Sequence, residues 1–415
     1  MVSNIIEKTE NKKGYKKTKL GWIPEEWEIV KIRDIVDKIE TGVSVNSENR
    51  PAKNNEFGIL KTSCVKDGIF RAFENKFILQ QELERAKLHP CRNCIIVSRM
   101  NTPELVGENA YVAEDYKNLY IPDRLWQIHI NKAINSKWLS YITGAKLFKR
   151  NLKLEATGTS NSMKNIAQES FLSQRIICPT KIEQEKIAEI LSAWDDGIET
   201  LEKLIEQKEV LKNSLAQKYF HRKNNLFQLK QHKLGELFKN RKETNCCDLE
   251  LLSVCDGLGI VPRSQLNAKD NSNEDKSKYL KVCVGDLAYN TMRMWQGRCG
   301  VSSYEGIVSP AYTVCIPKDN IDVDYMYYLF KTPHMIHDFW RYSQGIVDDT
   351  LNLKFNNFEA IKVWIPDKET QTKIAKLLKS YDEEIQILNS KLEKLKEQKK
   401  GLMQKLLTGQ IRVKV

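Results

Sequence analysis

Two long stretches of the chain place apolar residues at alternating spacings of three and four, which is the pattern of an amphipathic helix. They run from 182 to about 220 and from 369 to about 407, and both lack proline. Each follows a proline, Pro179 or Pro366, that ends a short apolar run. The apolar seam continues for about five heptads in the second stretch and has charged flanks, so we predict two long helices that form a coiled coil. Two amphipathic helices, each packed on its own domain, are the alternative.

The predicted interface between the helices consists of the apolar residues that recur at this spacing. They are Trp194, Ile198, Leu201, Ile205, Leu215, Tyr381, Ile385, Leu388, Leu392, Leu395 and Leu402. Lysines fill three further seam positions, Lys208, Lys212 and Lys399. At a rise of 1.5 Å per residue, about 40 residues span about 60 Å.

The segments before each helix show a different pattern. Short apolar and β-branched runs, such as 94–97, 311–314 and 361–364, alternate with glycine, asparagine and proline. Runs of this length between turn residues predict short strands, and a few helical stretches such as 324–331 lie among them. We therefore predict α+β domains with mostly antiparallel sheets.

The chain also repeats itself. A shift of 187 residues superimposes the two halves over a long stretch without gaps, placing Tyr141 on Tyr328 and Phe171 on Phe358. This period is too long for a solenoid and indicates two whole domains, each followed by its own helix. Two similar helices carry two similar seams, and antiparallel pairing about a pseudo-two-fold axis would let each seam cover the other.

In the earlier part of each domain, the two halves can be aligned only if gaps are introduced. There, residues 30–35 resemble 232–237, and Arg99-Met100 resembles Arg293-Met294. The predicted divisions are a basic arm at 1–19, a first mixed domain at 20–180, a first helix at 181–222, a second mixed domain at 223–366, a second helix at 367–408 and a tail at 409–415.

Composition adds a candidate partner. The 415 residues suit two or three domains, and the formal net charge of +12 favours a polyanion such as nucleic acid. The sequence has no run of about 18 consecutive apolar residues, so we expect no membrane span. The lysine-rich N-terminal residues lack the apolar run of a secretory signal, and we expect the chain in the cytoplasm.

Ten cysteines raise the question of metal binding. Most lie in apolar strand-like runs, for example Cys283 and Cys315, where a free cysteine acts as a small core residue. Cys91 and Cys94 form one Cys-x-x-Cys pair, preceded by His89, but the sequence shows no second ligand pair at a suitable spacing. We therefore predict no metal site.

The predicted architecture suits DNA because a DNA duplex has the same two-fold symmetry. Two similar domains would place equivalent surfaces on two half-sites. Since the two halves differ in sequence, the half-sites could differ, and the helix length would set the gap between them.

Several motifs carry a resemblance to a known family. They are 20–27 (LGWIPEEW), 406–413 (LLTGQIRV), 290–297 (NTMRMWQG) followed by 308–312 (VSPAY), and Pro-x4-Gln-x2-Ile-Ala at 179 and again at 366. In this order, and with the duplication, the chain resembles the specificity subunit of type I restriction–modification enzymes over essentially its whole length.

The resemblance implies a role and partners. Each mixed domain would be a target recognition domain that reads one half of a bipartite, asymmetric DNA site, and the helices would fix the spacer. Two DNA adenine methyltransferase subunits, and often two ATP-driven restriction subunits, would bind the chain. S-adenosylmethionine, ATP and Mg²⁺ would bind to those partners, and this chain would bind no cofactor itself.

The sequence contains no catalytic motif that we recognise. It lacks the Asn/Asp-Pro-Pro-aromatic segment and glycine-rich loop of adenine methyltransferases, and the phosphate-binding loop of ATPases. We predict a non-catalytic subunit. A coiled-coil scaffold without sequence-specific DNA binding is the alternative, and a self-sufficient nuclease, suggested only by the acidic pair at 348–349, is a third possibility.

Side chains that form paired hydrogen bonds with base edges are the candidates for DNA recognition. In the second domain we favour the 293–298 segment, where Trp295 would stack on DNA or belong to the core. The candidate residues are Arg99, Asn101, Thr102, Ser160, Asn161, Lys164, Arg293, Trp295, Gln296, Arg298, Ser343 and Gln344.

Overall fold

A computed structural model describes residues 13–158, 163–221, 226–255, 259–266, 273–345 and 350–414. The chain divides into two compact units. Unit 1 combines the residues up to Thr200 with those from Leu392 onward, and unit 2 is Leu201–Lys391. Each unit therefore contains one mixed domain and part of both long helices.

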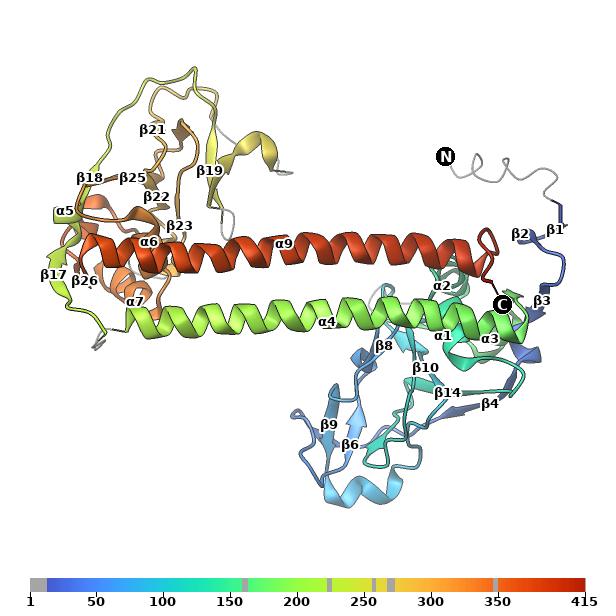
Figure 1. The fold of residues 1–415 in the computed structure, drawn as a ribbon. Helices are drawn as coiled ribbons and strands as arrows, with labels where there is room; N and C mark the ends of the chain where they lie inside the picture. The colour runs from blue at the N-terminus through green and yellow to red at the C-terminus, as the bar shows by residue number, and fades with distance from the viewer. Residues whose placement is uncertain are drawn as a thin grey trace. The chain divides into compact units, whose positions relative to one another are not determined.

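Both long helices are present where the sequence predicts them: α4 spans Lys181–Phe220 and α9 spans Lys368–Leu407 (Figure 1). Each begins directly after a capping residue. The Oγ1 of Thr180 accepts a hydrogen bond from the backbone N–H of Glu183 at 3.4 Å, and Oδ1 of Asp367 accepts one from Thr370 at 3.0 Å. These caps satisfy N–H groups that the first helical turn leaves without partners.

Within each unit, the segments of α4 and α9 run antiparallel. In unit 1, Lys399 pairs with Asp195. In unit 2, the Nζ of Lys208 lies 2.8 Å from Glu384, and Lys212 pairs with Asp382. Lys212 follows Lys208 in α4, whereas Asp382 precedes Glu384 in α9, so the two helices run in opposite directions. The predicted interface residues lie along these segments: Ile198, Leu201, Ile205 and Leu392 are buried, and Trp194, Leu215, Tyr381, Ile385, Leu388, Leu395 and Leu402 are half-buried.

Two of the seam lysines, Lys212 and Lys399, belong to a repeated three-residue contact. In unit 1, the Tyr141 hydroxyl donates to Asp195 at 2.6 Å, and Lys399 Nζ lies 5.5 Å from the Tyr141 ring centroid. In unit 2, Tyr328 donates to Asp382 at 2.6 Å, and Lys212 Nζ lies 5.7 Å from the Tyr328 ring. The charged lysine is tolerated in each seam because a carboxylate and an aromatic face receive it.

The main sheet of unit 1 has the strand order β12-β10-β14-β4, and all of its pairings are antiparallel. These strands are β12 (Asn109–Tyr111), β10 (Ile95–Ser98), β14 (Leu125–Ile130) and β4 (Val36–Thr41). A second sheet has the order β13-β6-β9-β5: β13 (Leu119–Tyr120), β6 (Gly58–Leu60), β9 (Asn75–Ile78) and β5 (Ser47–Glu48). The β13–β6 pairing is the one parallel pairing between described strands.

The remaining elements of unit 1 are strand pairs and short helices. The pairs are β1 (Tyr15–Thr18) with β2 (Gly21–Pro24), β3 (Glu28–Lys31) with β16 (Arg175–Cys178), β7 (Val65–Lys66) with β8 (Ile69–Phe70), and β11 (Met100–Asn101) with β15 (Lys164–Asn165). The helices are α1 (Ser136–Gly144), α2 (Lys146–Leu154) and α3 (Gln168–Ser173).

Unit 2 repeats the main sheet with the order β18-β25-β22-β23, which corresponds strand for strand to β4-β14-β10-β12. Its strands are β18 (Phe238–Asn240), β25 (Tyr312–Pro317), β22 (Leu287–Asn290) and β23 (Cys299–Val301). Further pairs are β17 (Lys230–Lys233) with β26 (Lys362–Ile365), β19 (Leu252–Cys255) with β20 (Gly259–Pro262), and β21 (Leu280–Val282) with β24 (Gly306–Val308). The helices are α5 (Leu234–Leu237), α6 (Val323–Phe330), α7 (Pro333–Tyr342) and α8 (Phe355–Phe358).

The long helices complete the core of each domain. In unit 1, Leu191 of α4 and Leu406 of α9 are buried in the cluster that contains Trp27 and Trp138. In unit 2, Phe220 of α4 and Leu378 of α9 join the corresponding cluster. The prediction of two α+β domains joined to an antiparallel helix pair is confirmed, and each helix also packs on a domain, as the alternative had proposed.

One local prediction is wrong. The apolar run at 282–284 was expected to be a strand, but β21 ends at Val282, and Val284 is 68% exposed. Gly285 adopts φ +86, so the chain turns here before it enters β22. Among the described residues, no helix combines the length and the apolar character that a membrane span requires.

Candidate nucleic-acid interface

In both units, a loop leaves the same central strand of the main sheet. The loop follows β10 in unit 1 and β22 in unit 2, and it contains most of the predicted DNA-contacting residues. A short hairpin lies beside each loop. Ile166 N–H donates to the carbonyl of Arg99 at 2.9 Å, and Leu353 N–H donates to the carbonyl of Thr291 at 2.8 Å.

The unit 2 loop combines a buried anchor with exposed polar ends. Met294 is fully buried in a short 3₁₀ turn (Met294–Gln296), and Gly297 adopts φ +75 beside Ile336 of α7. A Cβ at 297 would lie 3.3 Å from the Ile336 side chain, and the positive φ would strain any residue other than glycine. Gln296 and Arg298, on either side of the glycine, are exposed.

Two other predicted residues of this loop make contacts within it. Trp295 is half-buried, and its indole N–H donates to the carbonyl of Met292 at 3.0 Å. Arg293 is half-buried as well. Gln296 and Arg298 are therefore the exposed polar side chains of this loop.

The hairpin beside each loop is closed by a repeated bridge, Thr157 with Asn165 in unit 1 and Gln344 with Asn352 in unit 2. Gly345 follows Gln344, and a Cβ at this glycine would lie 2.7 Å from the carbonyl of Thr350. Gln344 is exposed, whereas Ser343 is half-buried and donates to the carbonyl of Phe339 at the end of α7.

The corresponding residues of unit 1 are more enclosed. The Nε of Arg99 donates to the Asp123 carbonyl at 2.7 Å, and Nδ2 of Asn101 donates to Ser98 Oγ at 3.1 Å. Lys164, which faces Asn101 across the β11–β15 pair, donates to the carbonyl of Gly158. Thr102 Oγ1 is buried. The predicted contacts Ser160 and Asn161 lie outside the described residues.

The sheet register corrects the sequence alignment of these loops. Arg99 N–H donates to Arg124 O, and Thr291 N–H donates to Ala311 O, so the counterpart of Arg99 is Thr291 and not Arg293. The connection that leaves the strand is also two residues shorter in unit 2 (290–298) than in unit 1 (98–108), so the two loops do not align without a gap.

The two hairpins share a polar feature that the sequence did not reveal. The side-chain oxygens of Asn165 and Asn352, equivalent under the 187-residue repeat, are buried and accept no hydrogen bond from the described residues. Buried polar atoms are normally paired, so these two oxygens are exceptions that the hairpins of both units share.

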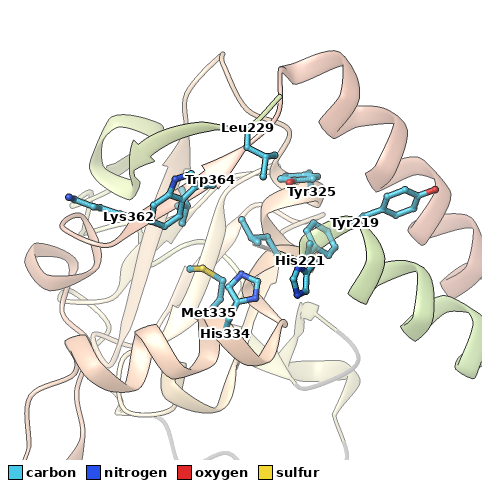
Figure 2. Close-up of a pocket in the computed structure, with 11 residues that line it drawn as sticks. Tyr219, His221, Leu229, Tyr325, His334, Met335, Lys362 and Trp364 are labelled. Carbon is cyan, nitrogen blue, oxygen red and sulfur yellow. The ribbon is translucent and has the colours of Figure 1, made fainter. Parts of the chain in front are cut away.

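Two cavities in the described part of the chain differ in size and lining. One in unit 2, lined by residues including His221, His334 and Trp364, holds only about 20 Å³, which is room for about one water molecule (Figure 2). An open hollow of about 550 Å³ in unit 1 is lined mainly by polar residues, among them Lys137, Lys181 and Glu185.

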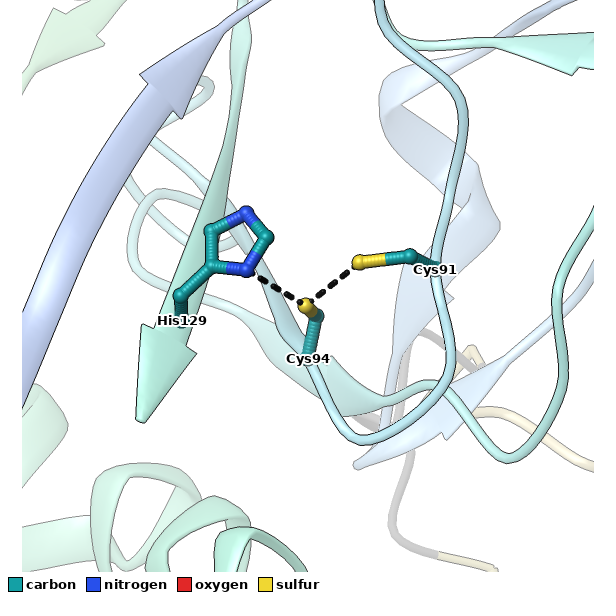
Figure 3. A group of neighbouring side chains, drawn as sticks. All are labelled: Cys91, Cys94 and His129. Carbon is teal, nitrogen blue, oxygen red and sulfur yellow. Dashed lines mark hydrogen bonds between the residues drawn. The ribbon is translucent and has the colours of Figure 1, made fainter. Parts of the chain in front are cut away.

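The structure reveals a cluster that the sequence analysis missed. His129 of β14 lies next to the Cys-x-x-Cys pair, with its Nδ1 3.4 Å from Cys94 Sγ (Figure 3). Sequence reasoning missed His129 because it is 35 residues from Cys94 and lies on the strand beside the one that Cys94 precedes.

Comparison with known proteins supports the architecture. A family model described as the type I restriction modification DNA specificity domain matches residues 24–210 and 264–397. The type I restriction enzyme MjaVIII specificity subunit of Methanocaldococcus jannaschii is 24% identical, over 94% of this chain and 94% of its own length.

Two solved structures share the fold. The S subunit of a type I restriction–modification system from M. genitalium has a TM-score of 0.59 at 16% identity, covering 92% of this chain and 96% of that one. A chain from a study of complex assembly and conformational transition of the type I system has a TM-score of 0.55 at 14% identity, covering 94% and 99%.

Proposed function

Because this chain belongs to the family of type I restriction–modification DNA specificity domains, we propose that it is the DNA-recognition subunit of a type I restriction–modification complex. Each unit reads one half of a bipartite, asymmetric site. The duplicated sheet carries this proposal, since it presents a loop from the same central strand twice, with different lengths and different side chains. Two equivalent surfaces with different contacts suit two half-sites of different sequence.

The test is to map methylated adenines in cells that carry this chain and a partner methyltransferase. A single motif with two unlike halves and a gap of fixed length is the expected result. Methylation without a bipartite motif would favour the scaffold alternative. Cleavage of plasmid by the purified chain alone with Mg²⁺ would favour a nuclease.

The proposal includes a division of labour. This chain supplies recognition without catalysis, while two methyltransferase subunits and, where present, two restriction subunits bind S-adenosylmethionine, ATP and Mg²⁺. The long helices supply docking surfaces for these partners, since their outer faces are rich in exposed charged residues. The expected location is the cytoplasm, where such a complex meets cellular DNA.

Helix length is proposed to set the spacer of the target. Inserting one heptad after Lys203 and one after Ser390, which are equivalent positions of the repeat, preserves the seam and adds about 10 Å to each helix. At 3.4 Å per base pair, the methylated motif should gain about three base pairs of spacer with unchanged half-sites. Long-read sequencing of methylated DNA measures both.

The matched control replaces seven existing residues at each position with the same heptad and leaves the length unchanged. It should keep the original spacer. An unaltered spacer in an active, lengthened variant would show that helix length does not set the gap.

A further inference from the structure

Three potential metal ligands meet on one face of the unit 1 sheet. Cys91 and Cys94 form a tight turn that leads into β10, and His129 lies on the adjacent strand β14. Cys94 Sγ is 2.7 Å from Cys91 Sγ and 3.4 Å from His129 Nδ1 (Figure 3). Cys94 is buried, whereas Cys91 and His129 are half-buried.

The surrounding hydrogen bonds hold these groups in place. His129 Nε2 lies 2.7 Å from Oε2 of Glu40 on β4, which directs the lone pair of Nδ1 toward the sulfurs when Nε2 carries the proton. The backbone N–H of Cys91 donates to Gln127 Oε1 at 3.1 Å. A histidine that binds a metal through one nitrogen and a carboxylate through the other is a recurrent arrangement in zinc sites.

The backbone of the 91–94 turn places the two cysteine sulfurs on the same side. Asn93 adopts φ +64, a conformation that few residues other than glycine take readily. The N–H of Cys94 donates to the carbonyl of Cys91 at 3.3 Å, and the N–H of Asn93 donates to Val112 on the neighbouring chain segment. Two cysteines separated by two residues in such a turn are the usual half of a zinc site.

The same corner of unit 2 contains a different charge arrangement. The sheet registers pair Ile95 with Ile128 and Leu287 with Cys315, which makes Asp286 the counterpart of Cys94. The Asp286 carboxylate accepts two hydrogen bonds from Arg241, at 2.7 and 3.0 Å.

The remaining positions correspond as well. Cys283 is the counterpart of Cys91, and Gly285, with φ +86, takes the place of Asn93. Unit 2 therefore closes this corner with a cation, the guanidinium of Arg241, against a buried acid. In unit 1, Glu40 takes the place of Arg241 and pairs with Lys38 of its own strand. The position of the Arg241 guanidinium therefore holds a carboxylate, which faces the imidazole of His129 and the two thiols.

We propose that unit 1 binds a zinc ion through Cys91, Cys94 and His129, with Glu40 as the hydrogen-bonding partner of the histidine. Thiolate and imidazole ligands select zinc over magnesium or calcium. A tetrahedral zinc ion places a sulfur and a nitrogen ligand about 3.5 Å apart and two sulfurs about 3.8 Å apart. The Cys94–His129 separation already fits, and the two sulfurs must move apart by about 1 Å.

A solvent or partner oxygen would take the fourth position, because Cys91 and His129 are only half-buried. Zinc binds cysteine as the thiolate, so Cys91 and Cys94 would each release a proton to solvent on metal binding. The ion would join three strands at the start of β10, whose other end leads to Arg99. Zinc binding by unit 1 does not require DNA recognition, and the experiment measures the metal content of the chain directly.

The experiment measures zinc in the purified full-length chain after dialysis against metal-free buffer with a reductant. The expected result is one zinc per chain by atomic emission. Cobalt replacement should give the intense visible bands of a four-coordinate ion and a thiolate-to-cobalt charge-transfer band. Cobalt reports on the unmutated protein, so this measurement does not depend on whether a variant folds.

Variants assign the ligands. Cys94→Ser and His129→Ala should lose the zinc, and Glu40→Gln should weaken zinc affinity about 10–100-fold. Cys247→Ser, which removes an exposed thiol of unit 2, is the control and should retain the metal. Three results would overturn the proposal. The wild-type protein could contain no zinc, or Cys94→Ser could retain it. The third is a mass lower by two hydrogens under reducing conditions, which would indicate a Cys91–Cys94 disulfide.

Discussion

Replacing Arg298 by alanine should relax recognition of one half of the DNA site and leave the other half unchanged. The side chain is exposed at the end of the unit 2 loop. Arginine forms paired hydrogen bonds with guanine more often than any other side chain, and losing one such contact costs about 1–3 kcal/mol, or about 5–150-fold in affinity. The reconstituted methyltransferase complex should therefore lose discrimination at one or two base pairs of a single half-site.

The measurement compares binding to duplexes that differ at one half-site at a time, at fixed salt concentration. Arg99→Ala changes the unit 1 loop at a position that is not equivalent to Arg298, and it should affect the opposite half-site. If Arg298→Ala weakened binding equally on every sequence and reduced the salt dependence by about one unit, the residue would be a phosphate contact and not a base contact.

Replacing Arg412 by methionine should destabilise unit 1 by about 3 kcal/mol, near the lower end of the range for breaking a buried ion pair. Arg412 donates to Oε1 of Glu183 at 2.8 and 3.0 Å, and the Glu183 side chain is fully buried. Trp27 and Thr180 still donate to Glu183 at 2.8 and 2.9 Å, and the Arg412 side chain is 36% exposed, which limits the loss.

Urea denaturation of the full chain measures this loss. Arg33→Met is the matched control, because Arg33 pairs with Glu169 at the exposed surface and should contribute no more than about 1 kcal/mol. If the two substitutions lowered the free energy of unfolding equally, burial of Glu183 would not determine the loss of stability.

The same pair predicts a pH dependence. Burial raises the pKa of Glu183, but hydrogen bonds from Arg412, Trp27 and Thr180 outweigh it, and the pKa lies below the ordinary value of 4.5. A lowered folded-state pKa contributes stability that is present above the unfolded-state pKa and is lost as the pH falls below it. The difference between wild type and Arg412→Met should therefore be largest near neutral pH and shrink below about pH 4.5.

Sequence periodicity was sufficient for the long helices and their pairing, because a heptad pattern depends on local spacing alone. The bounds of α4 and α9 agree with the expected stretches to within a residue. The seam lysines could be located but not explained, since their partners Tyr141 and Tyr328 are distant in sequence. The repeat then made the second domain predictable from the first.

The binding loops were predicted less well. Loop length changes between the units, and a gap in the alignment cannot be placed without knowing which residues pair across the sheet. The match of Arg99 with Arg293 rested on residue type alone, whereas the sheet register makes Thr291 the counterpart of Arg99. The metal ligands show the same limit, because Cys94 and His129 meet only through the β10–β14 register.

The division of the chain into units has a consequence for the order of folding during synthesis. Unit 2 is continuous, from Leu201 to Lys391, and interrupts unit 1. The buried Leu406 and Leu407, which pack into the core around Trp27, are translated after all of unit 2. During synthesis, all the residues of unit 2 are therefore available before those that complete unit 1. The core of unit 1 stays partly uncovered until Leu406 and Leu407 emerge.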